Sequence, residues 1–481
     1  MGAALAASVV IAAVVLASPA WAATYTVTND ADSGAGSLRQ AMIDANATTG
    51  VEDTINFDLG SAATITLTSG QLPTINDGAG LTIDGGSADI TVSGDHKYQV
   101  FNVDFGKLAL NNLTVADGGG LRGNGIYNFS GTVTLSNSTI SGNSATSGAG
   151  GGIHNIGGTL TVSNSTLSGN SANDGADGAF SKGGGIYTAH GTVTVSNSTL
   201  SGNSAASVGG GIYSEGDGQG TGKLEVSNST FSGNSNNGPF SFGGGSIHNE
   251  RGTATLKSTI VAKSPSASGE NCGGITITNG GYNLDSGTSC GFPTNRSSKD
   301  PLLGPLADNG GPTKTHALLE GSPAIDKGNS FGATTDQRGL PRPSNFADIV
   351  NAADGSDIGA FELQAPPTPP GTTPPTVIST FPADGGEVGP AANIRATFSE
   401  DMRPASFKDA FKLFRKGSTN QIAATVSYPN PNSLPYTAKL DPSNSLKRGA
   451  TYKAVVTTAL YLVPSRRLEF GFSIALLVVA L

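Results

Sequence analysis

Short stretches of alternating apolar and polar residues recur through the middle of the chain. In the segment 192–196, Thr-Val-Thr-Val-Ser, the valines face one way and the hydroxyl groups the other, which is the period of a β-strand. Within the repeats, no stretch of useful length has the period of an α-helix. The pattern therefore predicts a β-rich fold and argues against helical repeats and leucine-rich repeats.

The alternating stretches belong to a repeating unit. Four units begin at Gly118, Gly150, Gly183 and Gly209 and end in Ser-Gly-Asn, and a degraded fifth unit begins at Gly243. The closing asparagines are 27, 33 and 31 residues apart in sequence. A constant motif with a variable spacer predicts a solenoid whose inserted loops lie on one side.

Each unit holds three short predicted strands joined by Gly and Asn turns, which describes one coil of a right-handed parallel β-helix. Stacked coils place equivalent residues about 4.8 Å apart, so the repeats predict columns of side chains. Three columns are apolar and are expected to point inward: Ile126, Ile153, Ile186, Ile212 and Ile247; Val133, Leu160, Val193 and Leu224; Ile140, Leu167, Leu200 and Phe231. A fourth column is expected to form a structural amide ladder at a corner: Asn143, Asn170, Asn203 and Asn234.

Two features precede the repeats. Residues 1–23 are expected to be an export signal, because an apolar run is followed by Pro19 and by the small-x-small site Ala20-Trp21-Ala22, although no basic residue precedes the run. The alternative is a buried apolar helix. Residues 24–46 are expected to cap the first coil, since Ser37 and Gln40 match a capping box. Four residues of this segment share one helical face: Leu38, Ala41, Met42 and Ala45.

Several segments resemble bacterial surface proteins. The segment Gly36-Ser-Leu-Arg-Gln-Ala41 is similar to the opening of many bacterial surface β-helix proteins, with Gly36 in place of their usual cysteine. The Gly-Gly-Gly-Ile-x-Asn and Phe/Leu-Ser-Gly-Asn motifs of residues 118–260 resemble the repeats of polymorphic outer-membrane proteins, although only Phe231 supplies the phenylalanine. Together, these resemblances imply a surface or extracellular location, with outer-membrane association as one option, and no single defined activity.

The end of the predicted β-helix, residues 270–362, resembles a choice-of-anchor Q domain. Four motifs carry this resemblance: Gly304-Pro-Leu-Ala-Asp-Asn-Gly-Gly-Pro312, Gly321-Ser-Pro-Ala-Ile-Asp326, Asp336-Gln-Arg-Gly339 and Asp357-Ile-Gly-Ala-Phe-Glu362. With these motifs, the predicted β-helix covers residues 24–362.

A second domain is expected after a Pro- and Thr-rich linker at residues 363–375. Residues 376–458 hold short alternating strands separated by turn signals, so a β-sandwich is expected. The stretches Ala396-Thr-Phe-Ser-Glu-Asp-Met402 and Gly449-Ala-Thr-Tyr452 are similar to SbsA-type bacterial Ig-like domains. The resemblance fades near Thr458, which suggests that the last strand is missing. The apolar tail 459–481 ends in a run of twelve residues, too short for a spanning helix of roughly 20 residues. A membrane anchor and a misread chain end both remain open.

Composition and charge limit the class of protein and the kinds of partner that are expected. The 481 residues include 69 glycines without a strict every-third-residue period, which excludes collagen. The net charge of −9 comes without a basic stripe, so no nucleic-acid partner is expected. The two cysteines, Cys272 and Cys290, are expected to pair in an exported chain, with free buried thiols as the alternative. The sequence leaves membrane attachment and oligomeric state open.

No catalytic residues are expected. A glycoside hydrolase needs converging carboxylates, and a lyase needs a base near acidic residues. Glu215 and Asp217 fall in the variable spacers, Lys223 and Glu225 are alone on their strand, and no carboxylates are expected at matching positions in successive coils. A polysaccharide-active lyase or hydrolase is nevertheless the alternative to a non-catalytic surface protein.

Two groups of residues are candidates for binding. An outward column of rings could stack on sugar faces, although rings that stack only on one another are the favoured alternative: Tyr127, His154, Tyr187, Tyr213 and His248. No cofactor is expected, with Ca²⁺ the one candidate ion. Its weak candidate ligands lie in the segment that resembles the choice-of-anchor Q domain, where capping of turns is the favoured alternative: Asp308, Asp326, Asp336 and Asp357.

These observations predict a secreted or cell-surface β-helix protein. Its elongated face would serve adhesion or another surface interaction, with a glycan or another surface ligand as partner, and the Ig-like domain would act as a spacer. An autotransporter passenger is a further alternative, but the chain has no long C-terminal stretch of alternating strands for a barrel.

Overall fold

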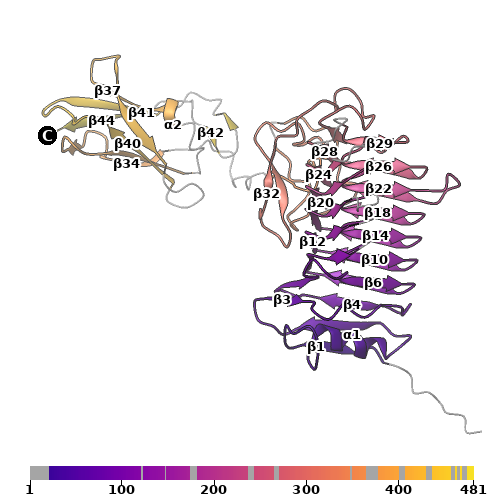
Figure 1. The fold of residues 1–481 in the computed structure, drawn as a ribbon. Coiled ribbons are helices and arrows are strands. Elements are labelled where there is room, and N and C mark those ends of the chain that lie inside the picture. Colours follow the sequence, from indigo (N-terminus) through magenta and orange to yellow (C-terminus); the bar gives the residue numbers. More distant parts are fainter. Residues whose placement is uncertain are drawn as a thin grey trace, which may run out of the picture. The chain divides into compact units, whose positions relative to one another are not determined.

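The computed structural model divides the chain into two compact units, residues 1–364 and 365–481. It describes residues 21–120, 123–146, 148–173, 181–236, 243–264, 270–346, 349–364, 377–399, 407–428, 436–456, 461–462, 466–467 and 474–480. The predicted export signal lies outside these residues up to position 20, as does the predicted linker from position 365 onward. The first unit is a parallel β-solenoid of about nine turns and the second is an antiparallel sandwich (Figure 1), so the predicted fold class is confirmed.

Four parallel sheets, called A, B, C and D, run along the solenoid. Each full coil contributes one strand to each sheet, in the order C, A, B, D along the chain. Sheet A holds β1 (Thr24–Val27), β2 (Asp53–Phe57), β4 (Leu81–Asp84), β7 (Lys107–Asn111), β11 (Thr132–Ser136), β15 (Thr159–Ser163), β19 (Thr192–Ser196), β23 (Lys223–Ser227), β27 (Thr253–Lys257) and β30 (Thr278–Asn279). Sheet C holds β6 (Phe101–Asp104), β10 (Ile126–Phe129), β14 (Ile153–Ile156), β18 (Ile186–Ala189), β22 (Ile212–Glu215), β26 (Ile247–Glu250) and β29 (Cys272–Gly274).

Sheet B and the narrow sheet D complete each coil. Sheet B holds β3 (Ala62–Thr66), β5 (Asp89–Ser93), β8 (Leu113–Ala116), β12 (Thr139–Ser141), β16 (Thr166–Ser168), β20 (Thr199–Ser201), β24 (Thr230–Ser232), β28 (Ile260–Ala262) and β31 (Leu284–Asp285). Sheet D consists of two-residue strands: β9 (Gly119–Gly120), β13 (Ser144–Ala145), β17 (Ser171–Ala172), β21 (Ser204–Ala205) and β25 (Ser235–Asn236). Three strands per coil were expected, because two residues are too few to show an alternating pattern.

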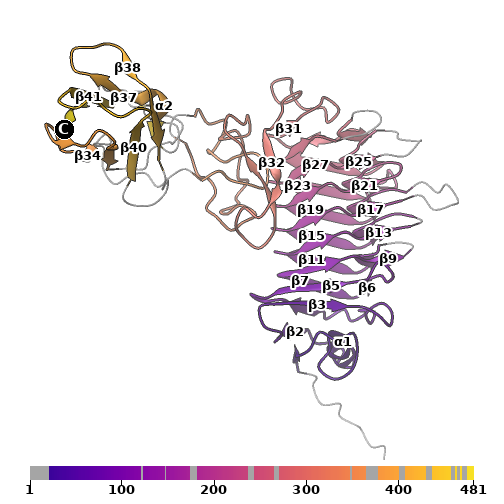
Figure 2. The ribbon, with the colours of Figure 1, turned by 60° about the vertical axis from the view of Figure 1, so that its left-hand side comes forward.

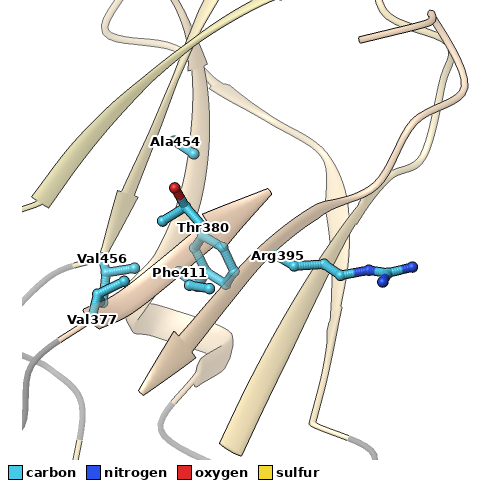
Figure 3. Close-up of a pocket in the computed structure, with 7 residues that line it drawn as sticks. Val377, Thr380, Arg395, Phe411, Ala454 and Val456 are labelled. Carbon is cyan, nitrogen blue, oxygen red and sulfur yellow. The ribbon is translucent and has the colours of Figure 1, made fainter. Parts of the chain in front are cut away.

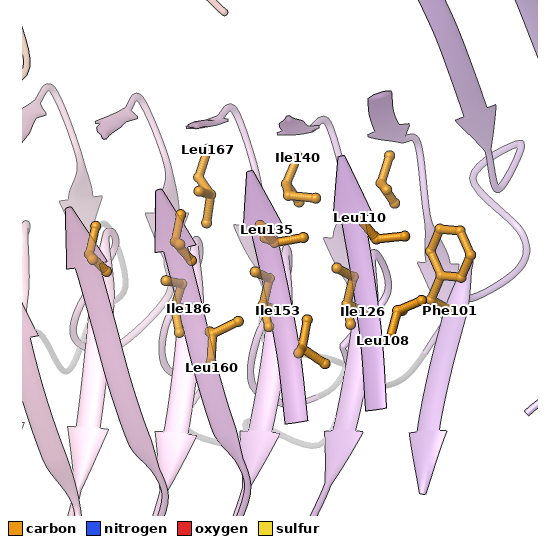
Figure 4. Close-up of a cluster of buried hydrophobic side chains, with 14 of the residues drawn as sticks. Phe101, Leu108, Leu110, Ile126, Leu135, Ile140, Ile153, Leu160, Leu167 and Ile186 are labelled. Atoms are coloured by element: carbon orange, nitrogen blue, oxygen red, sulfur yellow. The ribbon is translucent and has the colours of Figure 1, made fainter. Parts of the chain in front are cut away.

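The three apolar columns fill the solenoid interior, as predicted (Figure 4). Ile126 is the register partner of Ile153, which in turn is the partner of Ile186. All members of the three columns are fully buried and belong to one continuous cluster. Each coil therefore packs mainly on its two neighbours, and the stability of the solenoid is close to a sum over coils.

Polar ladders occupy two corners of the coil. At the first, the Nδ2 atoms of Asn143, Asn170 and Asn203 each donate to the Oδ1 atom of the next closing asparagine, at 2.9 Å in every case. All four ladder asparagines, including Asn234, are fully buried. The same Oδ1 atoms also accept backbone N–H groups, so the corner satisfies its own polar groups without water.

The second corner is built by the recurring Asn-Ser-Thr triplets. Their asparagines have left-handed backbones, which Asn tolerates better than most residues: Asn137, Asn164, Asn197 and Asn228. The following serine points inward, and the Oγ atom of Ser165 accepts the backbone N–H of Ser138 at 3.1 Å. The triplet therefore recurs because its three residues turn the corner, close a hydrogen bond and start sheet B.

The first coil is covered by helix α1 (Leu38–Asn46), as predicted (Figure 1). Leu38, Ala41, Met42 and Ala45 are its buried residues. Ser37 is the N-cap and accepts the backbone N–H of Gln40 at 3.2 Å. The reciprocal half of the capping box does not form, because the Gln40 side chain instead donates to Asp44.

Asp32 fastens this cap to the coil behind it. Its carboxylate pairs with Arg39 of α1 at 2.6 Å and accepts the backbone N–H of Ser69 at 2.9 Å. Burial raises the pKa of Asp32, but the hydrogen bonds from Arg39 and Ser69 outweigh that effect and hold the pKa at about 2.

The last coil ends at β31, and the following segment, residues 286–364, folds back along the outside of sheet B. It contains the short hairpin β32 (Leu303–Ala307) and β33 (Thr315–Leu318). Thr166 Oγ1 donates to the carbonyl of Lys314 at 2.6 Å, and Asn228 Nδ2 donates to the carbonyl of Ser330 at 2.8 Å. Sheet B is thus covered from β16 to β28 by the protein's own chain, which local strand patterns do not reveal.

Cys272 and Cys290 form a disulfide between β29 and this segment. Cys290 and Phe292 join the core cluster at the last coil, so both ends of the solenoid are covered.

The second unit is a sandwich of two sheets. One holds β34 (Val377–Phe381), β36 (Ile394–Phe398), β39 (Ala424–Ser427) and β40 (Tyr436–Pro442); the other holds β35 (Glu387–Val388), β37 (Phe411–Arg415), β38 (Gln421–Ile422), β41 (Thr451–Val456) and β44 (Ile474–Ala480). The short helix α2 (Phe407–Ala410) and the pair β42 (Tyr461–Leu462) and β43 (Arg466–Arg467) complete it.

The apolar tail corrects the predicted end of this domain. β44 pairs with β41 over six residues, from Ile474 opposite Val456 to Val479 opposite Thr451. The strand that the sequence suggested was missing is therefore supplied by the tail, because an apolar run can serve a sheet as well as a membrane. Among the described residues, no helix is long and apolar enough to span a bilayer.

Replacing Asn170 with alanine is expected to lower the free energy of unfolding by about 2–4 kcal/mol, because its neighbours in the buried ladder lose their partners. Urea titration followed by circular dichroism would measure the change. Asn173→Ala, at an exposed position a few residues away, should cost less than about 0.5 kcal/mol. Equal effects of the two changes would contradict the structural role of the ladder.

Asp32→Asn is expected to destabilise the protein by about 2 kcal/mol at pH 7. The folded pKa of Asp32 lies below its unfolded value, so this contribution is complete above about pH 4 and disappears as the pH falls toward 2. Melting temperatures of both proteins across this range would test the prediction. The exposed Asp30→Asn serves as control, and a pH-independent difference for Asp32→Asn would refute the linkage.

Candidate functional site

The predicted column of rings runs along the outer face of sheet C. Successive ring centroids are 5.3 Å apart from Tyr127 to His154, 4.6 Å from His154 to Tyr187, 5.3 Å from Tyr187 to Tyr213 and 5.5 Å from Tyr213 to His248. Each ring therefore contacts the next one, and the structure brings all five predicted residues together.

The column is not an open platform for sugars. Tyr213 is fully buried, and His154 and His248 are only 3% and 8% exposed. Two spacers pack close to the column residue that follows them through glycines with positive φ. A Cβ on Gly150 would lie 2.7 Å from the His154 Cβ, and one on Gly209 would lie 2.9 Å from the Tyr213 Cβ. The outward direction of the column was correctly expected, but its accessibility was not, because the alternation of a strand says nothing about what covers its outer face.

A polar cluster lies at the end of this column. Lys182 Nζ donates to the Tyr213 hydroxyl at 2.7 Å and lies 4.4 Å from the centre of that ring. The Tyr213 hydroxyl donates to Glu250, and the Tyr187 hydroxyl donates to Glu215 at 3.2 Å. Lys182 Nζ is also 3.5 Å from a Glu250 carboxylate oxygen.

Glu215 and Glu250 are register partners at the ends of β22 and β26. The expectation that successive coils carry no matching carboxylates is therefore wrong. It failed because Glu215 was assigned to the variable spacer, whereas β22 continues to this residue. Aligning Ile212-Tyr-Ser-Glu with Ile247-His-Asn-Glu on their isoleucines would have revealed the pair.

The electrostatics of the cluster favour one protonation state. Burial raises the pKa of Tyr213, and its hydrogen bond to Glu250 adds to the effect, so the phenol remains a donor. The same hydrogen bond holds the pKa of Glu250 below its usual value, despite partial burial, and Lys182 acts in the same direction. Glu250 is therefore an ionised acceptor. Burial also lowers the pKa of His248 and keeps its ring neutral.

The candidate calcium ligands do not converge. Asp308 accepts the N–H of Gly310 at an exposed turn, whereas Asp357 accepts the N–H of Asp326. Asp326 accepts the N–H of Phe346, and Asp336 pairs with Arg338 at 2.7 Å. Over the residues that the structure describes, no three His, Cys, Asp or Glu side chains form a group suited to a metal ion.

These carboxylates instead hold the turns of the segment that covers sheet B. A second ion pair there joins Arg342 and Glu362, whose side chains are both fully buried and 2.8 Å apart. Sequence reasoning had not singled out Arg342. Buried charge pairs and backbone amides thus fasten the segment in addition to its buried apolar residues, such as Ile358 and Phe361.

Sheet A presents a third kind of surface, which we call the hydroxyl face. It consists of the outward side chains of three consecutive strands: Thr132, Thr134 and Ser136; Thr159, Thr161 and Ser163; Thr192, Thr194 and Ser196. Thr159 is exposed and the other eight are half-buried by their neighbours in the stack. The three strands lie side by side in Figure 2. Charges begin only in the flanking strands, at Lys107 on one side and at Lys223 and Glu225 on the other.

The second unit contains a shallow apolar hollow between its two sheets (Figure 3). It is lined by Val377, Thr380, Arg395, Ala396, Phe411, Ala454 and Val456. The guanidinium of Arg395 points away from the hollow in this view. No set of polar groups converges there among the described residues, so the hollow lacks the features of a ligand site.

Residues 371–464 match the family of bacterial Ig-like domains. The second unit is a bacterial Ig-like domain. The match ends before β44, the strand that completes the sheet. Bacterial Ig-like domains are typical of surface or extracellular proteins. No curated protein matches the chain.

Tyr213→Phe is expected to lower the free energy of unfolding by about 1–3 kcal/mol, because Lys182 and Glu250 lose a buried partner. Tyr127→Phe, in the same column but half-buried, should cost less than about 0.5 kcal/mol. Thermal and chemical unfolding would measure both. A neutral Tyr213→Phe would mean that the cluster contributes nothing to the fold.

Proposed function

We propose that this protein is a secreted or cell-surface β-helix protein that works by adhesion and not by catalysis. The Ig-like domain and the solenoid fold support a surface or structural protein. The resemblance of residues 270–362 to choice-of-anchor Q domains and of the repeats to polymorphic outer-membrane proteins points to the same location. In this proposal the Ig-like domain is a spacer and the solenoid carries the binding surface.

The observation that carries the adhesive role is the hydroxyl face. The outer side of sheet B is covered by residues 286–364 from β16 to β28, and the rings of sheet C are buried or half-buried. By contrast, the nine side chains of the hydroxyl face lie at the surface, one exposed and eight half-buried. Each hydroxyl both donates and accepts, so an uncharged glycan rich in hydroxyl groups complements this face.

The regular spacing of the face compensates for weak single contacts. One hydrogen bond in water contributes only about 0.5–1.5 kcal/mol, so a single hydroxyl holds no ligand. Strands about 4.8 Å apart repeat the same group, and a glycan chain with its own repeat can engage several at once. We therefore expect an extended, uncharged polysaccharide rather than a monosaccharide.

The test is binding to a glycan array together with depletion onto insoluble uncharged polysaccharides. Thr134, Thr161 and Thr194, changed together to valine, keep their shape but lose three central hydroxyls. We expect about a 10- to 100-fold loss of affinity. A matched control is Thr82→Val with Thr255→Val, in the same column but outside the three strands. Undiminished binding by the triple variant would exclude the hydroxyl face, and no binding by the natural protein would exclude the proposal.

A polysaccharide-active enzyme is the second candidate, and the pair Glu215 and Glu250 favours it. Two carboxylates on adjacent strands are the minimum that a glycoside hydrolase needs, one as acid and one as base or nucleophile. Release of reducing or unsaturated sugar, lost in Glu250→Gln and retained in the nearby Glu225→Gln, would support this reading over adhesion. Against it, Glu250 already accepts a hydrogen bond from the fully buried Tyr213, and the Lys182 ammonium lies 3.5 Å from its carboxylate.

A further inference from the structure

Asp53, the first residue of β2, is a buried carboxylate close to the start of the solenoid. Asp53 is only 2% exposed. Its Oδ2 atom accepts the hydroxyl of Thr48 at 2.5 Å, and its Oδ1 atom accepts the backbone N–H of Ala23 at 2.7 Å. Among the described residues, no Lys, Arg or His side chain pairs with it. A carboxylate removed from water normally requires a cation or several strong donors, so two neutral donors leave its charge poorly compensated.

The position of Ala23 is fixed from both sides. Its N–H is held by Asp53, and its carbonyl accepts the backbone N–H of Thr54 at 2.9 Å. Ala23 itself is half-buried, whereas Trp21 and Ala22 are exposed, Trp21 to 81%. The peptide bond between Ala22 and Ala23 therefore joins an exposed residue to one that the solenoid holds by hydrogen bonds, directly after the small-x-small site Ala20-Trp21-Ala22.

We propose that the export-processing endopeptidase cuts between Ala22 and Ala23, and that the new α-ammonium group of Ala23 becomes the cation that pairs with Asp53. In this hydrolysis, water adds across the peptide bond. Its oxygen completes the Ala22 carboxylate, and the Ala23 nitrogen gains the protons of an ammonium group. The inference rests on the exported location in the proposed function, but not on any ligand.

The substitution of an ammonium for an amide needs no movement of the backbone. The same nitrogen already lies 2.7 Å from Asp53 Oδ1, which is the distance of a charge-assisted hydrogen bond. Before cleavage the Ala23 amide donates one neutral hydrogen bond to Asp53. After cleavage the Ala23 ammonium group forms an ion pair with Asp53 at a buried site. Removal of the signal would therefore stabilise the first coil, with β1 and the Thr48 turn that follows α1 held around one carboxylate.

The first test expresses the whole chain of 481 residues and identifies the amino terminus of the exported protein by mass spectrometry. A terminal peptide that begins at Ala23 supports the proposal. A terminus elsewhere, or an uncut chain in the exported fraction, overturns it.

The second test measures the ion pair in the protein that begins at Ala23. Acetylation of the Ala23 amine, or one extra residue before it, is expected to shift the unfolding equilibrium about tenfold toward the unfolded state. In Asp53→Asn the same acetylation should have no further effect, and the exposed Asp58→Asn should behave like the natural protein. If Asp53→Asn does not fold, the comparison of free and acetylated amine in the natural chain decides alone. Equal stability of those two forms overturns the pair, whatever the glycan assays show.

Discussion

The requirement that each coil hydrogen-bonds to the next in strict parallel register governs the whole solenoid. A parallel strand pairs residue by residue, so each position in a coil lies above its counterpart. A side chain that suits the interior, a corner or the surface must suit that place in every coil. The isoleucine columns, the asparagine ladder and the hydroxyl face are three consequences of this requirement. The Glu215 and Glu250 pair is a fourth, because the register places two like charges side by side. Lys182 and Tyr213 compensate the charge of Glu250.

The sequence predicted well the features that recur from coil to coil or that have a local signature. The inward columns, helix α1 with its Ser37 cap and the sandwich domain were all predictable, because each has a local signature: alternation, a capping residue or turn spacing. It failed where the deciding contact is long-range. The docking of residues 286–364 on sheet B joins residues more than a hundred positions apart, such as Thr166 and Lys314. The sequence around either residue contains no pattern that predicts this contact. β44 was missed for a related reason, since its partner β41 is separated from it by a stretch with no alternating pattern.

The candidate site shows the same division. The membership of the ring column followed from the repeat, but its burial depended on spacers that do not repeat. The glycine-rich spacers differ in length, yet two of them place a glycine close to the Cβ of the column residue that follows, Gly150 beside His154 and Gly209 beside Tyr213. Their shared role is visible only in three dimensions. Of the three broad faces, one is used for internal docking, one is lined by covered rings, and one is left with uncharged hydroxyl groups. A binding function is therefore best sought on the hydroxyl face of sheet A, whose side chains are uncharged.

The covered ends of the solenoid carry one more consequence. A stack of parallel strands has no intrinsic length, and an uncovered terminal coil would offer a ready template for the terminal coil of another molecule. Helix α1 at one end, and Cys290 with Phe292 at the other, place side chains where such a template would be. The number of coils is therefore set within the chain itself, because neither end presents a bare strand edge that repeats the pattern of the coils.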